Sequence, residues 1–216
     1  MSGRRFAAVA ILAPLVVFGA VAAQVSGDGR GFGIDEPVAG ALSAVAPISS
    51  DEVHIDPVLS IATLLVAGLT GLVLIGLLAR RQLKAALYLT GAIGASVLLS
   101  SVAKEIVQRP PIEGPADEYS FPSGSATWCM ATCAAAVLLA EARERRPLAI
   151  AGALFALAYA AIVVWEEWHY ASDVVAGWCL ALVSATGLWV GLGRPRSRLL
   201  PLRERSRGAS LGYPSS

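Results

Sequence analysis

Charged residues are scarce in this chain, and residues that bind metals are scarcer. Asp, Glu, Lys and Arg make up 15% of the 216 residues, and there are only two histidines and three cysteines. Cys129, Cys133 and Cys179 lie inside apolar runs, where we expect them to act as packing residues. The second histidine, His54, lies in a long loop far from His169 in sequence, so a metal site is not expected. The sequence therefore predicts no metal and no cofactor.

Apolar residues dominate what is present. They make up 56% of the chain, and the mean hydropathy of +0.64 exceeds that of an ordinary soluble domain. Uncharged runs near or above about 18 residues are typical of membrane-spanning helices. We predict an all-α fold, a bundle of six transmembrane helices in one membrane domain over residues 1–193. The predicted helices cover about 6–25, 58–79, 85–103, 123–140, 147–165 and 174–193.

Both ends of this domain carry further predictions. Arg4 and Arg5 precede the first apolar run, and Ala20-Val21-Ala22 resembles a cleavage site, so a secretory signal is an alternative to the first helix. The run from Phe6 to Ala23 is longer than the usual signal core of about 7–15 residues, so we keep it as a helix. The tail at 194–216 is basic and is predicted to be disordered.

The charges are sorted between the two sides of a six-helix topology. Of the 17 Lys and Arg residues, 14 fall on one side, whereas 13 of the 16 acids fall on the other. The positive-inside rule makes the basic side cytoplasmic and places both termini there. A composition rich in Ala, Gly, Val and Arg suggests a GC-rich bacterium. We therefore expect a multi-pass protein of the bacterial inner membrane, with no nucleic-acid partner.

The long acidic loop between the first two predicted spans contains a weak helical pattern. Val38, Leu42 and Val45 follow Asp35 at helical spacing. This pattern predicts a short interfacial helix that starts at an Asp35 cap and covers the mouth of the bundle.

Two polar clusters, 104–127 and 166–177, are predicted to meet on the acidic side. Lys104 and Arg109 supply cations in the first cluster. In "FPSGSAT", Ser123 or Ser125 can cap a helix whose first N–H groups point outward, and such a helix start attracts anions. An ordinary cap followed by a turn glycine, Gly124, remains the alternative.

His169 and Asp173 form the core of the second cluster. Their i, i+4 spacing places them on one helix face. The Asp can accept the proton of one imidazole nitrogen and leave the other nitrogen as a nucleophile or base. A capping Asp beside an interfacial His is the alternative interpretation.

Taken together, three segments resemble the type 2 phosphatidic acid phosphatase family, membrane phosphatases related to vanadium haloperoxidases. They are the stretch from Lys104 to Arg109, "PSG" at 122–124, and "HYASD" at 169–173. The resemblance implies a phosphohistidine mechanism. His169 would be the nucleophile and Asp173 its orienting partner. The phosphate cradle would consist of Lys104, Arg109, Ser123, Gly124 and Ser125.

Three positions depart from the family pattern. Pro111 replaces a second arginine, Ser125 replaces a histidine that is the presumed general acid, and Ile162-Val163 replaces a Ser-Arg pair. Glu166 and Glu167 also bring negative charge towards the predicted phosphate site, unless one of them serves as proton donor.

Two functions therefore remain open. The first is a lipid phosphatase that hydrolyses a lipid phosphate or a polyprenyl diphosphate on the extracytoplasmic face. The second is a non-catalytic family member that binds a lipid or a membrane partner. The loss of the acid favours a substrate with a good leaving group, because a diphosphate needs less help from a proton donor than a monoester does. The lipid itself and the oligomeric state stay open.

Overall fold

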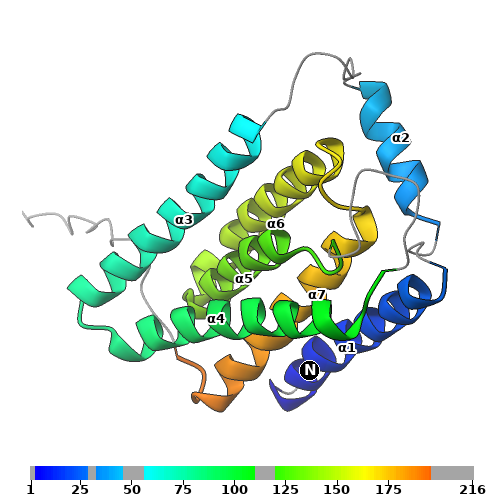
Figure 1. Ribbon diagram of the computed structural model, residues 1–216. Coiled ribbons are helices and arrows are strands. Elements are labelled where there is room, and N and C mark those ends of the chain that lie inside the picture. The colour runs from blue at the N-terminus through cyan, green and yellow to red at the C-terminus, as the bar shows by residue number, and fades with distance from the viewer. Residues whose placement is uncertain (1–2, 29–32, 46–55, 110–119, 196–216) are drawn as a thin grey trace, which may run out of the picture.

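The computed structural model describes residues 3–28, 33–45, 56–109 and 120–195. Within these ranges every regular element is a helix (Figure 1), which confirms the all-α prediction. The helices are α1 (Gly3–Asp28), α2 (Asp35–Val45), α3 (Asp56–Ala79), α4 (Leu83–Ile106), α5 (Gly124–Leu139), α6 (Ala142–Trp165) and α7 (Ala171–Gly191).

Five of these helices are long and apolar enough to cross a membrane, namely α1, α3, α4, α6 and α7. The sixth predicted span corresponds to α5, which has 16 residues. Its length of about 24 Å is less than the roughly 30 Å of a bilayer core. Pro122 and the cap at Ser123 delay the start of this helix, and Ala140 ends it. The bundle is therefore built from five long helices and one shorter apolar helix.

Helix α7 lies at the centre of the bundle and contacts α1, α2, α4, α5 and α6. Small residues along it, among them Ala176, Gly177 and Ala181, are buried and permit this close packing. Helix α5 also packs on α3, α4 and α6. The two helices that begin with the predicted polar clusters are thus the best-packed pair, which fixes their starts relative to each other.

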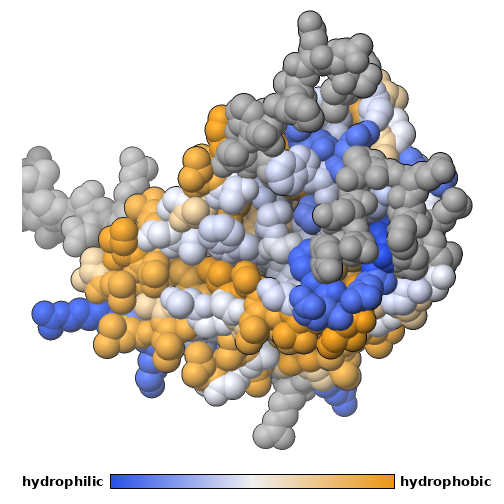
Figure 2. Space-filling view, viewed as in Figure 1, coloured by the Kyte–Doolittle hydropathy of each residue, from blue (hydrophilic) through white to orange (hydrophobic). Residues whose placement is uncertain are grey.

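Large apolar side chains cover the outer faces of the long helices. Leu12, Leu64, Leu72, Leu98 and Leu154 are each more than 60% exposed. Figure 2 shows such side chains over α3 and α4, whereas hydrophilic side chains gather where α4 ends. Lipid rather than water is the natural environment for so much exposed apolar surface. The chain is a multi-pass membrane protein.

The first helix is an integral part of this bundle. Val21 and Val25, in its second half, pack with Phe121 and Ala176. Its second half therefore lies beside the starts of α5 and α7, and its first residues lie at the opposite end of the bundle. That opposite end also holds the α3–α4 turn and the start of α6.

The short helix predicted near Asp35 is present as α2. It packs against α6 and α7, and Leu42 contacts the core formed by α3, α5, α6 and α7. The prediction of an Asp35 cap is wrong, because Asp35 is the first residue of α2 and is buried, and the first helical hydrogen bond runs from the Val38 N–H to the Ile34 carbonyl. The predicted tail from residue 196 onward lies outside the described residues.

Candidate active site

The start of α5 presents unsatisfied backbone donors. Ser123 is the N-cap, and its hydroxyl accepts a hydrogen bond from the backbone N–H of Ala126 at 3.3 Å. The backbone carbonyl of Ser123 accepts hydrogen bonds from the N–H of Thr127 at 3.0 Å and from its hydroxyl at 2.6 Å. No described residue accepts from the N–H groups of Gly124 and Ser125. These two donors and the helix dipole make a site for an anion.

The start of α7 is joined directly to the start of α5. The backbone N–H of Ser123 donates to the backbone carbonyl of Asp173 at 3.0 Å. The helices approach so closely that a Cβ on Gly177 would lie 2.5 Å from Thr127 Oγ1 and 2.7 Å from the Ser123 carbonyl oxygen. The two polar clusters therefore meet at one end of the bundle, as the sequence predicted.

A Schellman turn at the end of α6 brings His169 to this place. The N–H of Trp168 donates to the carbonyl of Val163 at 3.2 Å, and the N–H of Glu167 donates to that of Val164 at 3.1 Å. Glu167 has a φ of +59°, the left-handed conformation that this motif requires. The N–H of His169 also donates to the Val163 carbonyl, at 3.2 Å. The backbone of the histidine is thus fixed by the last turn of α6.

The imidazole of His169 faces the carboxylate of Asp173. Nδ1 lies 3.5 Å from Asp173 Oδ2, which also accepts the backbone N–H of Tyr170 at 3.0 Å. The Asp173 side chain is fully buried, whereas the imidazole remains 15% exposed. A buried carboxylate at Nδ1 favours the tautomer that carries its proton there and leaves Nε2 with a lone pair. The two groups therefore face each other as predicted, but the prediction of one shared helix face is wrong, because α7 begins only at Ala171, after its N-cap Tyr170. Nδ1 has no hydrogen-bond partner among the described residues, and the orienting role of Asp173 stays a prediction.

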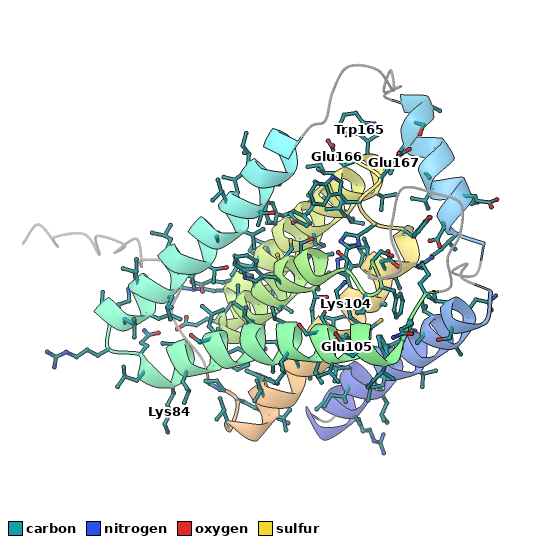
Figure 3. All side chains as sticks on the ribbon, viewed as in Figure 1. Lys84, Lys104, Glu105, Trp165, Glu166 and Glu167 are labelled. Atoms are coloured by element: carbon teal, nitrogen blue, oxygen red, sulfur yellow. The ribbon has the colours of Figure 1, made fainter. Side chains whose placement is uncertain are left out.

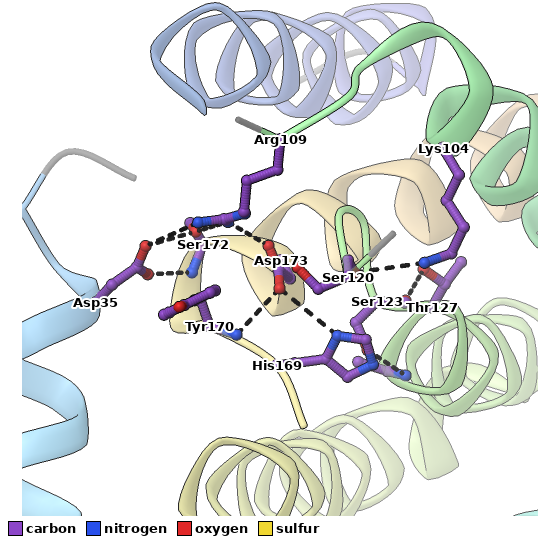
Figure 4. A network of polar contacts seen from close by, with 11 residues as sticks. Asp35, Lys104, Arg109, Ser120, Ser123, Thr127, His169, Tyr170, Ser172 and Asp173 are labelled. Carbon is purple, nitrogen blue, oxygen red and sulfur yellow. Dashed lines mark hydrogen bonds and ion pairs between the residues drawn. The ribbon is translucent and has the colours of Figure 1, made fainter. Parts of the chain in front are cut away.

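Arg109 lies deeper in the site than the sequence suggested. Its Nη2 donates to Asp173 Oδ1 and, at 2.9 Å, to the hydroxyl of Ser172 (Figure 4). Its Nη1 lies 3.8 Å from Asp35 Oδ2, and its guanidinium stacks 4.4 Å from the centre of the Tyr170 ring. Burial raises the pKa of the Tyr170 phenol, so the ring meets the cation in its neutral form. Only 1% of the Arg109 side chain is exposed.

Lys104 approaches the site from the last turn of α4. Its Nζ donates to the backbone carbonyl of Ser120 at 3.4 Å, and its side chain is partly buried. Figure 4 shows its amine on the side of the site near Ser123 and Thr127, away from Asp35. Lys104 and the α5 start therefore form one side of the site, whereas Arg109 and Asp35 form the other.

Comparison with known families identifies the fold. The model of the PAP2 superfamily matches residues 85–196, which is more than half of the chain. The chain belongs to the PAP2 superfamily. A solved structure, the first transmembrane PAP2 type phosphatidylglycerolphosphate phosphatase from Bacillus subtilis, is similar with a TM-score of 0.66 and 19% sequence identity. The similarity covers 85% of this chain and 96% of that one. A search of curated proteins gave no match.

Membership of the PAP2 superfamily confirms the resemblance noted in the sequence. It supports a phosphatase, and more specifically a membrane lipid phosphatase. Within the described residues, no group of three or more His, Cys, Asp or Glu side chains is placed to hold a metal ion.

The positions that depart from the PAP2 pattern have distinct surroundings. Val163 is fully buried in the core between α3, α5, α6 and α7, and its carbonyl anchors the turn before His169. Ser125 is partly exposed at the open start of α5. Pro111 lies outside the described residues. An apolar side chain thus occupies the position of one PAP2 arginine.

The two glutamates next to His169 lie at the α6–α7 turn. Figure 3 shows Glu166 and Glu167 beside α2, at the end of α6. Glu167 is exposed, whereas Glu166 is partly buried. Glu167 occupies the left-handed position of the turn. Its place in the structure is therefore set by the backbone and does not require a role in proton transfer.

Sequence reasoning missed three polar contributors to the PAP2 site. They are the carboxylate of Asp35, noted only as a helix cap, and the side chains of Ser172 and Tyr170 inside the "HYASD" segment. Asp35 and Ser172 are separated by 137 positions in the chain. No local spacing rule predicts a contact between residues so far apart. The acid at the start of the predicted amphipathic helix was only a partial indication of a polar contact there.

Proposed function

We propose that this protein is a phosphatase for lipid phosphates or polyprenyl diphosphates that works through a phosphohistidine intermediate. The observation that carries the proposal is the pairing of His169 with the buried Asp173, directly beside the open start of α5. A nucleophile with a fixed tautomer and a preformed anion site are the two parts that in-line phosphoryl transfer needs most.

The reaction would proceed in two displacements. In the first, the lone pair on His169 Nε2 attacks phosphorus while the bond to the leaving oxygen breaks, and Nδ1 keeps its proton towards Asp173. In the second, water attacks the phosphohistidine, the P–N bond breaks, and inorganic phosphate leaves. Both transition states spread negative charge over the equatorial oxygens. The Gly124 and Ser125 N–H groups, with the ammonium of Lys104, are placed to stabilise that charge.

The predicted cradle residues contribute in different ways. The hydroxyl of Ser123 is buried and caps α5, so Ser123 shapes the anion site through the backbone. Ser125 is partly exposed and offers both N–H and hydroxyl. Arg109 as a direct phosphate ligand stays a prediction, because its buried guanidinium already contacts Asp35 and Asp173.

A diphosphate is the preferred substrate on chemical grounds. A monoester expels an alkoxide, and proton donation to such a group contributes about 10²–10⁴ in rate. A polyprenyl diphosphate expels a prenyl phosphate, which needs much less help. Ser125, where the family has its acid, cannot supply a proton as a histidine does. The substrate class proposed is therefore a lipid diphosphate.

The non-catalytic alternative rests on a specific observation. Among the described residues near the α5 start, Lys104 is the cation, while Arg109 is balanced by two carboxylates and Val163 replaces an arginine. Loss of one donor to a developing oxyanion commonly costs about 10²–10³ in rate. A site so depleted suits a protein that binds a lipid phosphate or a membrane partner without turnover.

Phosphate release by the purified protein in detergent distinguishes the phosphatase from the non-catalytic lipid-binding protein. The panel would contain phosphatidic acid, phosphatidylglycerophosphate and a polyprenyl diphosphate, each with the wild-type chain and with His169→Ala. We expect release from the diphosphate by the wild type and none by the variant. Equal release by both proteins would exclude the phosphohistidine mechanism. No release by either, with retained binding of the lipid, would favour the non-catalytic function.

The site is proposed to face away from the cytoplasm. Arg80, Arg81, Arg145 and Arg146 lie at the end of the bundle opposite to His169, according to the helix bounds. The positive-inside rule places that basic end in the cytoplasm. The bacterial inner membrane with both termini inside remains part of this proposal.

A further inference from the structure

Asp35 uses both of its carboxylate oxygens on the first turn of α7. Oδ1 accepts the backbone N–H of Ser172 at 2.8 Å, and Oδ2 accepts its hydroxyl at 2.9 Å. The N–H groups at a helix start have no partner within the helix, so Asp35 acts as a cap supplied from another helix. Its side chain is 9% exposed, which makes this a buried, charge-assisted contact. The start of α2 is thereby fixed onto the start of α7.

The same carboxylate borders the guanidinium of Arg109. Oδ2 of Asp35 lies 3.8 Å from Nη1, and the Ser172 hydroxyl, which donates to that oxygen, accepts from Nη2. Tyr170 covers the guanidinium face at 4.4 Å. Arg109 is thus held by a carboxylate, a hydroxyl and a ring in one orientation. A phosphate approaching it would also meet the negative charges of Asp35 and Asp173.

That orientation bears on the catalytic pair, because the two oxygens of Asp173 have separate partners. Oδ1 accepts from Arg109, whereas Oδ2 accepts from Tyr170 N–H and faces His169 Nδ1. The contact of Oδ1 with Arg109 and that of Oδ2 with the Tyr170 N–H together keep Oδ2 towards the imidazole (Figure 4). A displacement of Arg109 would leave the Tyr170 N–H alone to hold the carboxylate.

We propose that Asp35 is a positioning residue that acts through Arg109 and Asp173 to hold the tautomer and direction of the His169 imidazole. In this arrangement Arg109 belongs to the orienting side of the site, and Lys104 with the start of α5 forms the phosphate side. The catalytic meaning of the proposal rests on the proposed function. The positioning itself does not, and can be measured without turnover.

The direct test is to determine the tautomer of the His169 imidazole by nitrogen-15 NMR. The chain has two histidines, so His54→Gln leaves a single imidazole to observe. At a pH where that imidazole is neutral, in a nanodisc, we expect one tautomer with the proton on Nδ1. Asp35→Asn should convert this to a mixture of tautomers. An unchanged single tautomer in a folded Asp35→Asn protein would overturn the proposal.

Two further variants make this test specific. Glu36→Gln removes the same charge from the next, exposed residue of α2 and should leave the tautomer unchanged. If Asp35→Asn does not fold, as judged by size exclusion and circular dichroism, Ser172→Ala takes its place. It removes the hydroxyl between Asp35 and Arg109 but keeps the N–H contact, and it should also give a tautomer mixture. A single tautomer there would contradict the proposal.

Kinetics then separate positioning from competition with substrate. For a chain that turns over a polyprenyl diphosphate, Asp35→Asn should lower kcat by about 10–100-fold, as loss of an orienting partner commonly does. KM and inhibition by inorganic phosphate should stay within about twofold, since the lost contact does not bind substrate. Asp35→Glu should restore part of kcat.

Tighter binding of inorganic phosphate by Asp35→Asn would overturn the proposal, since it would mean that Asp35 occupies the substrate's place on Arg109. If the wild type has no turnover, the proposed function fails, and the tautomer still decides the positioning.

Discussion

The backbone N–H of Ser123 donates to the backbone carbonyl of Asp173 at 3.0 Å. Through this one bond, the cap of the proposed phosphate-binding helix and the residue that orients the proposed nucleophile are joined without any side chain. Substitution of either side chain leaves the two backbone groups that form this bond in place. The bond exists because α5 and α7 approach closely at Gly177, and the first prediction concerns that approach.

Gly177→Ala should destabilise the protein and disturb the proposed phosphate site. The added Cβ would lie 2.5 Å from Thr127 Oγ1 and 2.7 Å from the Ser123 carbonyl oxygen, so the two helices must separate. Overpacking of this kind costs about 1–3 kcal/mol. Urea unfolding in mixed micelles would measure the loss. Gly187→Ala is the matched control, since its Cβ would meet nothing within 4 Å on the same helix. Equal stability of the two variants would contradict the close approach.

Arg109→Met should be among the most destabilising single substitutions. It would leave Asp35 and Asp173 buried without their shared cation, and breaking a buried ion pair costs about 3–5 kcal/mol. The same unfolding measurement applies. Arg146→Met is the control, because Arg146 is exposed on α6 and its loss should change stability by less than about 0.5 kcal/mol.

Adding Asp35→Asn to Arg109→Met should recover part of that loss. Removal of one of the two uncompensated charges lowers the cost of burial, so the two effects should not be additive. Strict additivity in the double-mutant cycle would show that Asp35 and Arg109 do not interact energetically.

Glu167→Gly should stabilise the turn before His169. The left-handed backbone at φ +59° costs a residue with a Cβ about 1–2 kcal/mol, and glycine lacks this cost. Thermal unfolding would report the gain. Glu167→Ala removes the same charge but keeps the Cβ, so it separates the backbone effect from electrostatics. A gain in the alanine variant equal to that in the glycine variant would point to charge instead.

Ser125→His should raise hydrolysis of monoesters more than that of diphosphates. It restores an imidazole at the start of α5, where a proton donor helps an alkoxide leave and helps a prenyl phosphate much less. The measurement is the ratio of the two kcat/KM values before and after the substitution. If a protein with Ser125 intact, but with Glu166 and Glu167 both replaced by Gln, cleaves phosphatidic acid as fast as a polyprenyl diphosphate, the leaving-group argument is wrong.

Cysteines introduced at Glu167 and at Arg81 should be labelled from opposite sides of the membrane. Both positions are exposed and lie at opposite ends of the bundle. A membrane-impermeant maleimide applied to intact cells should label the first and not the second. The native chain is the control for its own cysteines, of which Cys129 and Cys179 are buried and Cys133 is partly buried. Labelling of both sites from outside would contradict the proposed orientation.

Most of the fold followed from the sequence because apolar runs of this length leave few alternatives to spanning helices. The helix ends were less predictable. Helix α6 begins at Ala142 rather than at 147, since charged residues such as Glu144 continue the helix beyond its apolar part and Pro147 is accommodated within it. The start at Ser123 was predictable, because a cap and a proline mark it locally.

The site was predictable where its residues are close in sequence. His169 and Asp173 are four positions apart, which predicted their contact, but His169 precedes Tyr170, the N-cap of α7, so the turn after α6 rather than a shared helix face brings them together. The role of Arg109 was not accessible in the same way. Its place in the structure depends on Asp35, in another helix, and on the burial of both. From its charge alone, Arg109 was assigned the same phosphate-binding role as Lys104. The packing of α2 on α7 brings Asp35 to Arg109 and so distinguishes the surroundings of the two cations.

The short length of α5 bears on the depth of the proposed phosphate site. With 16 residues it measures about 24 Å, against about 36 Å for the 24-residue α4 and α6. Its amino end is recessed from the end of α4, because a Cβ on Gly124 would lie 3.9 Å from Ser100 Oγ, about 9 Å before Ile106 at the rise of an α-helix. If the protein is the proposed lipid phosphatase, a substrate whose chains stay in the leaflet must extend its headgroup to this recessed helix start. Activity in reconstituted bilayers should therefore be higher with lipids of shorter acyl chains, because a thinner membrane shortens the distance from the lipid headgroups to the start of α5.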